Sequence, residues 1–529
     1  MKNIRLIISA LLASAFVAVS CNETEDVACT ISADRLAITD VPAQDPAEEV
    51  LVITTDAPYW IVQAPSWAKP DAISGIGRGS STVKFIIESN YKNEKTDVAG
   101  RSGEIKFSGG GTSLIIPINQ QGYTAPVDPN ASIGGITDME EFKSFIAAVN
   151  AESGLSRWLN EDGEVELLTD LNLASFETWV PIGTPESVNN GNNNSSYKGA
   201  AFRGVFNGGG HTISNLNISE TMEDASTLGF FGVLDNATVK NLTIMGSLTV
   251  DATGTADAGI LAGTVISSTI ENVKVEGTIN STGSTATKRF ALGGIAGFAF
   301  SIANEGVAAN TLIKNCDVKC NVTAVGGGNL ANGATAAQYG GIAGFSTNPK
   351  DDSRVIIEEC TVGGDLNVTL GRCSGIVATA KAGTAIKGCT NNANQTTAIP
   401  NGRIGNIVSV LAVNCSVEDC TNNGNLTTSG EQTTTGAIAA LLNDNTVYIK
   451  GGRNNGTIVG ANTAFLGLIA ANFSKFTSVS DFVVSGKIGK YVEGSAPEMY
   501  DLSESTFMNY IGNIADASLP KLSNITFEK

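Results

Sequence analysis

Cysteine is the residue type in this sequence whose number could support metal or redox chemistry. Nine cysteines occur, at positions 21, 29, 316, 320, 360, 373, 389, 415 and 420. Zinc sites commonly combine cysteine pairs with histidine, but the chain holds one histidine, and neither Cys316/Cys320 nor Cys415/Cys420 has a histidine partner. We therefore expect no metal site at these pairs.

Four cysteines recur at one position of a repeated phrase: Cys316, Cys360, Cys389 and Cys420. Other copies of the phrase carry Leu216, Leu242, Val273 and Phe482 there, so the position is interpreted as buried and apolar. Stacked strands lie about 4.8 Å apart, whereas a relaxed disulfide joins Cβ atoms about 3.8 Å apart. The column is therefore predicted to hold free thiols in a structural role.

Acid–base catalysis would need a placed histidine or a pair of carboxylates. His211 follows Gly208-Gly209-Gly210, where a structural role in a turn is favoured over a catalytic one. Glycoside hydrolysis uses two carboxylates about 5–10 Å apart. Acidic residues are sparse between 164 and 490. The adjacent Asp351 and Asp352 are expected in a loop, and the adjacent Glu358 and Glu359 are expected on opposite faces of a strand.

The basic residues Arg354, Arg372 and Arg403 are expected to be scattered over different rungs of the repeat. Asp351 and Asp352 could also bind calcium, but carboxylates at regular spacing are missing. These observations predict no catalytic residue, no metal and no cofactor. A polysaccharide lyase or glycoside hydrolase remains the enzymatic alternative.

Two tryptophans, Trp60 and Trp67, are the candidate ligand-binding residues, because an indole face can stack on a sugar ring. The alternative is that both pack between strands. They belong to a segment, residues 30–123, that alternates apolar and polar positions between glycine-rich turns. Its short strands are typical of an immunoglobulin-like β-sandwich.

A longer repeat dominates the rest of the chain. A glycine–aliphatic phrase recurs eight times, from Gly229-Phe230 through Gly294-Ile295 and Gly341-Ile342 to Gly467-Leu468, about every 34 residues. Between successive copies lies an aliphatic-x-x-apolar phrase, with an asparagine column at Asn215, Asn241, Asn272 and Asn315. Asparagine tolerates the left-handed backbone of a corner, and stacked amides can bond along an axis.

This pattern predicts an all-β chain in which the sandwich precedes a right-handed parallel β-helix. The predicted domains are a signal peptide (1–21), an acidic tether (22–29), the sandwich (30–123), a linker (124–135), a capping helix (136–163), the β-helix (164–490) and a C-terminal cap (491–529). The helix is predicted to begin at Thr137 as N-cap and to bury Met139, Phe142, Phe145, Ile146 and Val149.

Several segments resemble known families. Ala18-Val19-Ser20-Cys21, after a short apolar run, resembles a bacterial lipobox, and the acidic residues behind it resemble the export tag of Bacteroidetes-type surface lipoproteins. Trp60, Trp67, Asn90, Arg101 and the closing Ile118-Asn119-Gln120-Gln121-Gly122 resemble the BACON domain. Trp179-Val180-Pro181-Ile182-Gly183, with Phe202 to Ile213 and the Gly-Gly-Ile-Ala-Gly phrases, resembles GLUG-motif β-helix proteins of adhesin type.

These resemblances imply lipid attachment at Cys21, on the outer membrane and facing the cell exterior. The chain has 33 basic and 52 acidic residues, which argues against nucleic acid as a partner. We expect a monomeric, non-enzymatic surface protein that adheres to host or matrix ligands or binds glycans. The second alternative, after polysaccharide degradation, is a structural part of a surface layer or fimbria.

Overall fold

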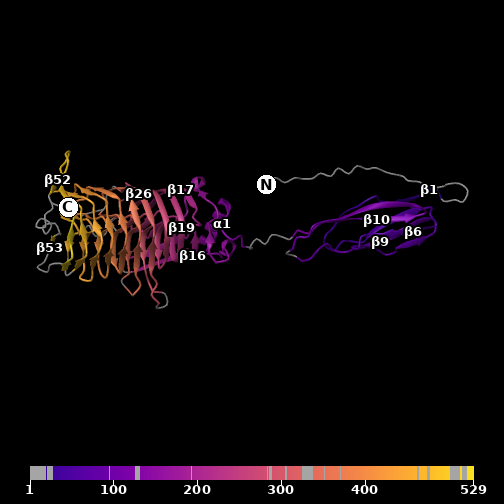
Figure 1. Cartoon of the computed structure of the whole chain (residues 1–529), viewed down its shortest axis with the longest axis horizontal. Coiled ribbons are helices and arrows are strands. Elements are labelled where there is room, and N and C mark those ends of the chain that lie inside the picture. The colour runs from indigo at the N-terminus through magenta and orange to yellow at the C-terminus, as the bar shows by residue number, and fades with distance from the viewer. Residues whose placement is uncertain are drawn as a thin grey trace. The chain divides into compact units, whose positions relative to one another are not determined.

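The computed structural model describes residues 19–20, 28–93, 96–124, 132–191, 194–282, 284, 289–303, 307–324, 337–348, 350, 352–369, 371–461, 464–473, 477–500, 513–514 and 521–528. The chain divides into two compact units, Met1–Pro129 and Asn130–Lys529, and Figure 1 shows both. The predicted lipid-attachment residue Cys21 and the loop residue Asp351 lie outside the described residues. Within the described part, no helix is long and apolar enough to cross a membrane.

The first unit is a β-sandwich, as predicted. One sheet holds β4 (Ile38–Val41), β11 (Thr112–Gln120), β10 (Arg101–Gly109), β6 (Tyr59–Gln63) and β8 (Ser74–Ile76). The other holds β3 (Ile31–Ala33), β5 (Glu49–Thr55), β9 (Gly79–Ile87) and β7 (Ala68–Pro70). A pair of short strands, β1 (Val19–Ser20) and β2 (Ala28–Cys29), precedes them. Alternate residues of these strands, such as Leu51, Phe85 and Phe107, are fully buried between the sheets.

The second unit begins with helix α1 (Met139–Asn150). Its N-cap is Asp138 and not Thr137, because the Asp138 carboxylate accepts bonds from the backbone N–H of Glu140 and Glu141, both at 2.9 Å. The predicted apolar face is buried at Phe142, Phe145, Ile146 and Val149, and Met139 packs against the same core. Figure 1 shows α1 at the end of the coil where β16 (Phe202–Asn207) and β17 (Thr212–Met222) lie.

The rest of this unit is a parallel β-helix of about eight turns, as the repeat predicted. An eight-stranded sheet holds β18 (Ser226–Leu228), β20 (Ala256–Gly259), β23 (Phe290–Gly293), β27 (Ala337–Gly340), β32 (Arg372–Ser374), β37 (Arg403–Gly405), β42 (Thr434–Gly436) and β47 (Phe465–Gly467). From β20 onward, each strand turns sharply into the next column, which holds β21 (Ala262–Ile266), β24 (Ala296–Phe300), β28 (Ala343–Thr347), β33 (Val377–Ala382), β38 (Val408–Leu411), β43 (Ala439–Leu442) and β48 (Ala470–Phe473).

Further columns complete each turn. The strands β19 (Phe231–Ala252), β22 (Thr269–Ser281) and β26 (Asp317–Ala324) each run through more than one of these columns. The shorter ones form three stacks: β25 (Thr311–Lys314), β29 (Val355–Glu358), β34 (Thr384–Lys387), β39 (Ser416–Glu418), β44 (Tyr448–Lys450) and β49 (Ser478–Ser480); then β30 (Thr361–Gly363), β35 (Thr390–Asn391), β40 (Thr421–Asn422), β45 (Arg453–Asn454) and β50 (Val483–Val484); then β31 (Asp365–Val368), β36 (Asn394–Thr397), β41 (Leu426–Thr428), β46 (Ile458–Gly460) and β51 (Ile488–Lys490).

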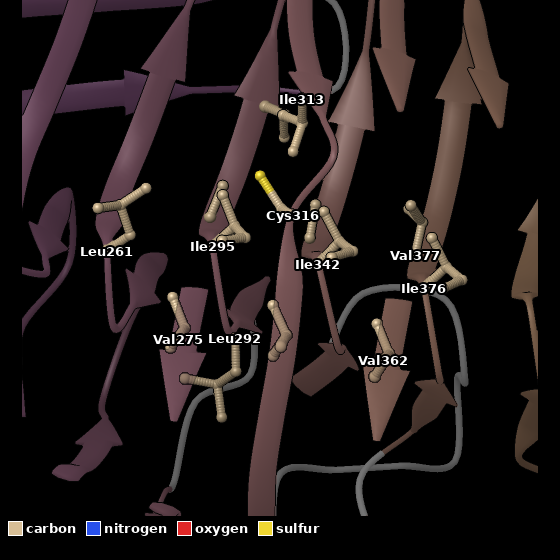
Figure 2. Packing of buried hydrophobic residues seen from close by; sticks show 14 of the residues in the cluster. Leu261, Val275, Leu292, Ile295, Ile313, Cys316, Ile342, Val362, Ile376 and Val377 are labelled. Atoms are coloured by element: carbon tan, nitrogen blue, oxygen red, sulfur yellow. The ribbon is translucent and has the colours of Figure 1, made fainter. Parts of the chain in front are cut away.

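Stacking places like residue over like residue in the core. Leu261, Ile295, Ile342 and Ile376, from successive glycine–aliphatic phrases, follow one another along the coil in Figure 2 and are fully buried. The glycine that ends three of these phrases lies against the neighbouring sheet, since a Cβ on Gly297 would stand 2.3 Å from the Ala258 nitrogen. The phrase therefore encodes a bend that brings two sheets together.

The coil begins at β12 (Val165–Glu166) and β13 (Leu171–Asn172) and continues past the predicted end at residue 490. The last strands, β53 (Asn513–Ile514), β54 (Lys521–Ser523) and β55 (Thr526–Phe527), pair in parallel with β48, β49 and β50. The segment assigned to a cap thus supplies one more turn. Strand β52 (Glu498–Tyr500) pairs antiparallel with β51.

Candidate functional site

A groove of about 730 Å³ runs along one side wall of the β-helix. We call it the side-wall groove. Its lining combines amide and hydroxyl groups with an apolar floor and two charges: Ser214, Asn215, Asn217, Ser247 and Asn321; Leu173, Ala174, Phe176, Leu216 and Met245; Glu276 and Lys319; and the glycines Gly246 and Gly277. The strands that form it are β17, β19, β22 and β26, joined at one end by the short 3₁₀ helix η2 (Leu173–Ser175).

Register explains why these side chains share one surface. Asn217 pairs with Ser247, and two rungs further the same column reaches Asn321. The Ser247 hydroxyl donates to the Asn217 Oδ1 at 2.9 Å. The adjacent column carries Gly246 and Gly277, whose missing side chains leave room, and a Cβ on Gly246 would lie 2.4 Å from the Leu216 carbonyl oxygen. The wall is therefore indented along the glycine column and polar beside it.

Charges at this wall belong to a small network. Glu276 lies 2.6 Å from Lys274 on the same strand and faces Lys319 on the next rung. The hydrogen bond and positive charge of Lys274, supported by Lys319, lower the pKa of the Glu276 carboxyl. Glu276 is thus an ionised hydrogen-bond acceptor, and it is the one carboxylate among the residues that line the groove.

A second groove, of about 410 Å³, lies further along the coil. Its lining includes Asp352, Arg354, Lys381, Asn414 and Tyr448. The Arg354 Nη2 donates to the Asn414 carbonyl oxygen at 2.7 Å.

Behind this second groove, the Tyr448 hydroxyl donates to the Glu418 Oε1 at 2.8 Å. Burial opposes ionisation of Glu418, but the bonds from Tyr448 and Ser416 and the nearby Lys387 and Arg354 outweigh it and lower the pKa of the carboxyl. Glu418 is therefore held as an acceptor beside the groove.

The two candidate tryptophans of the sandwich have different environments. Trp60 is 3% exposed and packs edge-on against Phe107, with ring centroids 5.9 Å apart. Its ring is therefore covered by the sandwich core, as the packing alternative required. Trp67 is half-buried, and the Arg101 guanidinium lies 4.6 Å from its ring centroid.

The side chains of the cysteine column are buried in the core of the β-helix. Cys316, Cys360, Cys389 and Cys420 are each at most 2% exposed, and each thiol donates to the backbone carbonyl two residues before it. The seven cysteines of the described β-helix are all free thiols. The hydrogen bond with Cys360, followed by burial, raises the pKa of Cys316. At Cys360 the bond with Cys316 lowers the pKa, but the bond with Cys389 and burial outweigh it, and at Cys389 burial and the bond with Cys420 outweigh the bond with Cys360, so both pKa values are raised. These thiols are therefore poorly suited to nucleophilic or ligand chemistry.

The asparagine corner also has the expected backbone. Asn215, Asn241, Asn272 and Asn315 all have φ between 51° and 57°. The amide of Asn272 donates to Asn241 at 3.2 Å, and that of Asn215 donates to Asn172 at 2.9 Å. The same corner is occupied by Asp419, Asp481 and Asn524 in later turns, all with positive φ. The Asn241 amide donates to Asn207 and not to Asn215, so the predicted amide ladder is interrupted, while the positive φ of the corner continues along the coil.

His211 lies in its turn beside Asp170, with Nδ1 3.0 Å from the carboxylate, which also accepts the Thr212 N–H at 2.9 Å. This geometry fits the structural alternative. Among the described residues, no group of three or more His, Cys, Asp or Glu side chains is placed to hold a metal ion.

Sequence reasoning missed a second asparagine ladder, which is buried inside the coil. Asn391 donates to Asn422 at 2.9 Å, and Asn422 donates to Asn454 at 2.8 Å. Each also donates to a backbone carbonyl two residues on, such as that of Gly424. The signal was present as Thr-Asn-Asn, Thr-Asn-Asn and Arg-Asn-Asn at the same place in three repeats.

Sequence reasoning was wrong about two of the arginines, which do not lie scattered. Arg372 and Arg403 are direct register partners on neighbouring rungs. The recurring spacing could have shown this, because each arginine lies four residues before the core isoleucine of its glycine–aliphatic phrase, Ile376 and Ile407.

Comparison with known proteins adds likenesses of limited extent. No family model matches the chain. Halomucin of Haloquadratum walsbyi is 43% identical over 81 residues, 15% of this chain, which spans about 1% of that protein's length. A candidate immunoglobulin A1 protease from Bacteroides ovatus aligns at 22% identity and a TM-score of 0.36, over 52% of this chain and 77% of that one.

Two further solved structures align. One is an IgA1 protease, at 12% identity and a TM-score of 0.34, over 95% of this chain and 32% of that one. The other is a Bacteroides ovatus GH5 xyloglucanase in complex with a XXXG heptasaccharide, at 14% identity and a TM-score of 0.15, over 42% of this chain and 46% of that one. These values assign no activity to the chain.

Proposed function

We propose that this protein binds glycans without cleaving them, and that the side-wall groove of the β-helix is the binding surface. The lining of the groove carries the proposal. Amide and hydroxyl groups of Asn217, Ser247 and Asn321 follow one register column, beside the apolar surface of Met245 and Phe176. A sugar ring offers the complementary pattern, with hydroxyl groups at its edge and C–H groups on its faces.

The charges favour binding over cleavage. General acid catalysis needs a carboxyl whose pKa is raised so that it keeps its proton near neutral pH. The Glu276 carboxyl in the groove has its pKa lowered instead, by Lys274. An ionised acceptor of this kind can bond sugar hydroxyl groups, and it does not supply the proton that a leaving group needs.

The competing function is polysaccharide cleavage, and the second groove is the feature that favours it. There Asp352 lies with Arg354 and Lys381, while Glu418 contacts the lining residue Tyr448 from behind. Two carboxylates with basic residues are what a lyase or hydrolase would use.

The test is binding of the purified protein to an array of neutral and acidic glycans, with product analysis of the same mixtures. We expect binding without new reducing ends or unsaturated products, and Met245→Ala should weaken it about tenfold, the loss of roughly one buried thioether contact. Met499→Ala is the matched control, because Met499 is 41% exposed and Met245 is 42% exposed. Products that vanish in Asp352→Asn would assign the protein to the enzymes instead.

We further propose that Cys21 carries a lipid that anchors the protein on the outer face of the outer membrane. The support is the lipobox-like Ala18-Val19-Ser20-Cys21 and the acidic Glu23, Glu25 and Asp26 behind it. Mass spectrometry of the protein from membranes should find a diacylglyceryl cysteine that Cys21→Ser abolishes. Protease added to intact cells should remove the protein. A protein that is released from the cells would contradict the lipid anchor. A protein that resists protease until the cells are opened would contradict its location on the outer face.

A further inference from the structure

The outer side of the bend between the two sheet columns forms a crease that runs along the β-helix. Each turn contributes two side chains to it, one from the eight-stranded sheet and one seven residues later from the next column. These pairs are Asp257 with Thr264, Ala291 with Phe298, Gln338 with Phe345, Arg372 with Thr379, Arg403 with Val410, and Thr434 with Leu441. We call this the outer crease.

Side chains of the outer crease contact one another across the bend. The Arg372 Nη1 donates to the Thr379 hydroxyl at 2.6 Å, and that hydroxyl in turn donates to the Gln338 Oε1. Arg372 is 5% exposed, Gln338 is 2% exposed and Thr379 is 1% exposed. These crease side chains are therefore removed from water, although they lie on the opposite side of the strands from the main core.

Arg289, which contacts the crease residue Asp257, shows how the fold neutralises a buried arginine at this surface. Arg289 bonds both oxygens of Asp257, through Nε at 3.1 Å and Nη2 at 2.8 Å. The Asn190 amide donates to the same carboxylate at 2.8 Å. The guanidinium also lies 4.5 Å from the ring centroid of Phe298. A carboxylate in the crease thus binds a buried arginine in bidentate geometry.

Arg372 and Arg403 lack such a carboxylate. The Arg372 Nε is buried without any hydrogen-bond partner, and the Arg403 side chain makes no hydrogen bond or ion pair with the described residues. The crease residue seven positions after Arg403 is Val410, which is apolar. Burial, together with the charge of Arg403, lowers the pKa of Arg372 to about 9, and burial lowers the pKa of Arg403. Two like charges on adjacent rungs, partly removed from water, are costly until an anion joins them.

We infer that Arg372 and Arg403 form a binding site for the anionic group of an acidic glycan, a carboxylate or a sulfate held between the two guanidinium groups. The inference rests on the proposed glycan binding for the class of ligand. Arg403 is half-buried, whereas Arg372 is buried, so the anion would enter the site from the solvent-exposed side of Arg403. The planar N–H fork of each guanidinium matches both oxyanions, and the occupant would take the place that Asp257 takes beside Arg289.

The experiment measures thermal unfolding and calorimetric binding at fixed ionic strength, with sodium chloride as the reference salt. The probes are glucuronic acid, an oligogalacturonate, a sulfated galactan oligosaccharide and the neutral cellohexaose. We expect one of the two acidic oligosaccharides, or both, to raise the Tm saturably, because a ligand that binds the folded state alone stabilises it. The stronger of the two identifies the anionic group.

The variants are Arg372→Gln and Arg403→Gln, with Arg453→Gln as the matched control. Arg453 lies on the same coil and pairs with Glu528. We expect each crease variant to weaken acidic oligosaccharide binding at least about tenfold and to leave cellohexaose binding unchanged. Without ligand, the crease variants should unfold at the same temperature as the parent or higher, because they remove an uncompensated buried charge. A structural role of Arg372 would lower this temperature instead.

Other outcomes separate the two proposals. Equal binding by the parent and both crease variants would overturn the anion site and leave glycan binding at the side-wall groove standing. Polyglutamate is added as a polyanion that is not a saccharide, and its binding in preference to every saccharide would overturn the glycan class of the ligand. If cellohexaose and all other neutral glycans fail while oligogalacturonate binds through Arg372, the side-wall groove is wrong and the crease site stands.

Discussion

The carboxylate of Asp257 and the guanidinium of Arg289 form a bidentate ion pair, although the two residues are one turn of the coil apart in sequence. Both side chains are nearly inaccessible, with 1% and 8% of their surface exposed. Burial raises the pKa of the Asp257 carboxyl, and the charge and hydrogen bonds of Arg289 oppose that shift. A buried pair of this kind adds little net stability, because the cost of removing both charges from water offsets their attraction.

The ion pair gives a prediction about coupled variants. Arg289→Met should lower the free energy of unfolding by about 3–5 kcal/mol, since it leaves Asp257 buried without a counter-ion. Asp257→Leu combined with Arg289→Met should recover most of this loss. The double-mutant cycle compares the parent, Arg289→Met, Asp257→Leu and the double variant. Denaturant unfolding, monitored at the transition of the β-helix, gives the free energy of unfolding of each. Additive losses in the double variant would mean that the pair is not coupled.

The pH dependence of Arg289→Met follows from the same burial. With Arg289 absent, burial acts on Asp257 against the Asn190 hydrogen bond, and it raises the folded pKa above the unfolded value near 3.9. A carboxyl with a raised folded pKa stabilises the protein fully below the unfolded pKa, and this contribution is lost as the pH rises through the folded value. The defect of the variant should therefore be smaller at pH 4 than at pH 7.

Adjacent glycines provide a test of the stacked backbone. Gly364 has φ of +105°, and a Cβ there would lie 2.1 Å from the Cys320 carbonyl oxygen on the rung below. Gly363 lies beside it, and a Cβ at that position meets nothing within 4 Å.

Gly364→Ala should therefore destabilise the coil by about 2–4 kcal/mol, through left-handed strain and overlap with the backbone. Gly363→Ala should change stability by less than about 1 kcal/mol. Thermal unfolding by circular dichroism compares the two variants directly. Equal effects would show that the rung spacing relaxes to accept a side chain.

Repetition is why so much of this fold could be predicted from the sequence. A core position such as Ile342 has the same surroundings as Ile295 one turn earlier, so its residue type recurs and marks the stack. Corner conformations recur likewise, and the asparagines from Asn215 to Asn315 were recognised for that reason. The sandwich was found from alternation, which exposes one face of β6 and buries Trp60 and Val62 on the other.

The ion pair of the outer crease escaped sequence analysis because one of its two partners lies outside the recurring positions of the repeat. Asp257 and Arg289 come from different turns, and Arg289 precedes its strand. Buried polar positions such as Arg372 and Gln338 look like exposed ones in an alternating strand, since only tertiary packing covers them. The side-wall groove was missed because a missing side chain, at Gly246, leaves no chemical signature.

The buried asparagine ladder gives a prediction with its own internal control. Asn422 is fully buried and joins Asn391 to Asn454, whereas its neighbour Asn423 donates to Asn392 on the exposed surface. Asn422→Ala removes the bond that the Asn391 amide donates and the bond that the Asn454 Oδ1 accepts, both in a fully buried site, which should cost about 2–4 kcal/mol. Asn423→Ala should cost under about 1 kcal/mol. Urea unfolding with matched m-values distinguishes them, and similar losses would deny the inner ladder a stabilising role.

The buried cysteines, inside and outside the cysteine column, should be unreactive toward thiol reagents. Burial raises the pKa of the Cys373 thiol and raises that of Cys320 to about 12, so neither forms thiolate at pH 8. Ellman's reagent, which reacts with thiolate, should label none of the eight described cysteines in the folded protein within minutes at pH 8. Unfolding in guanidinium chloride should expose all of these thiols to the reagent. Because the barrier is burial, raising the pH to 9.5 should not restore labelling, and rapid reaction of Cys360 in the folded protein would contradict a closed core.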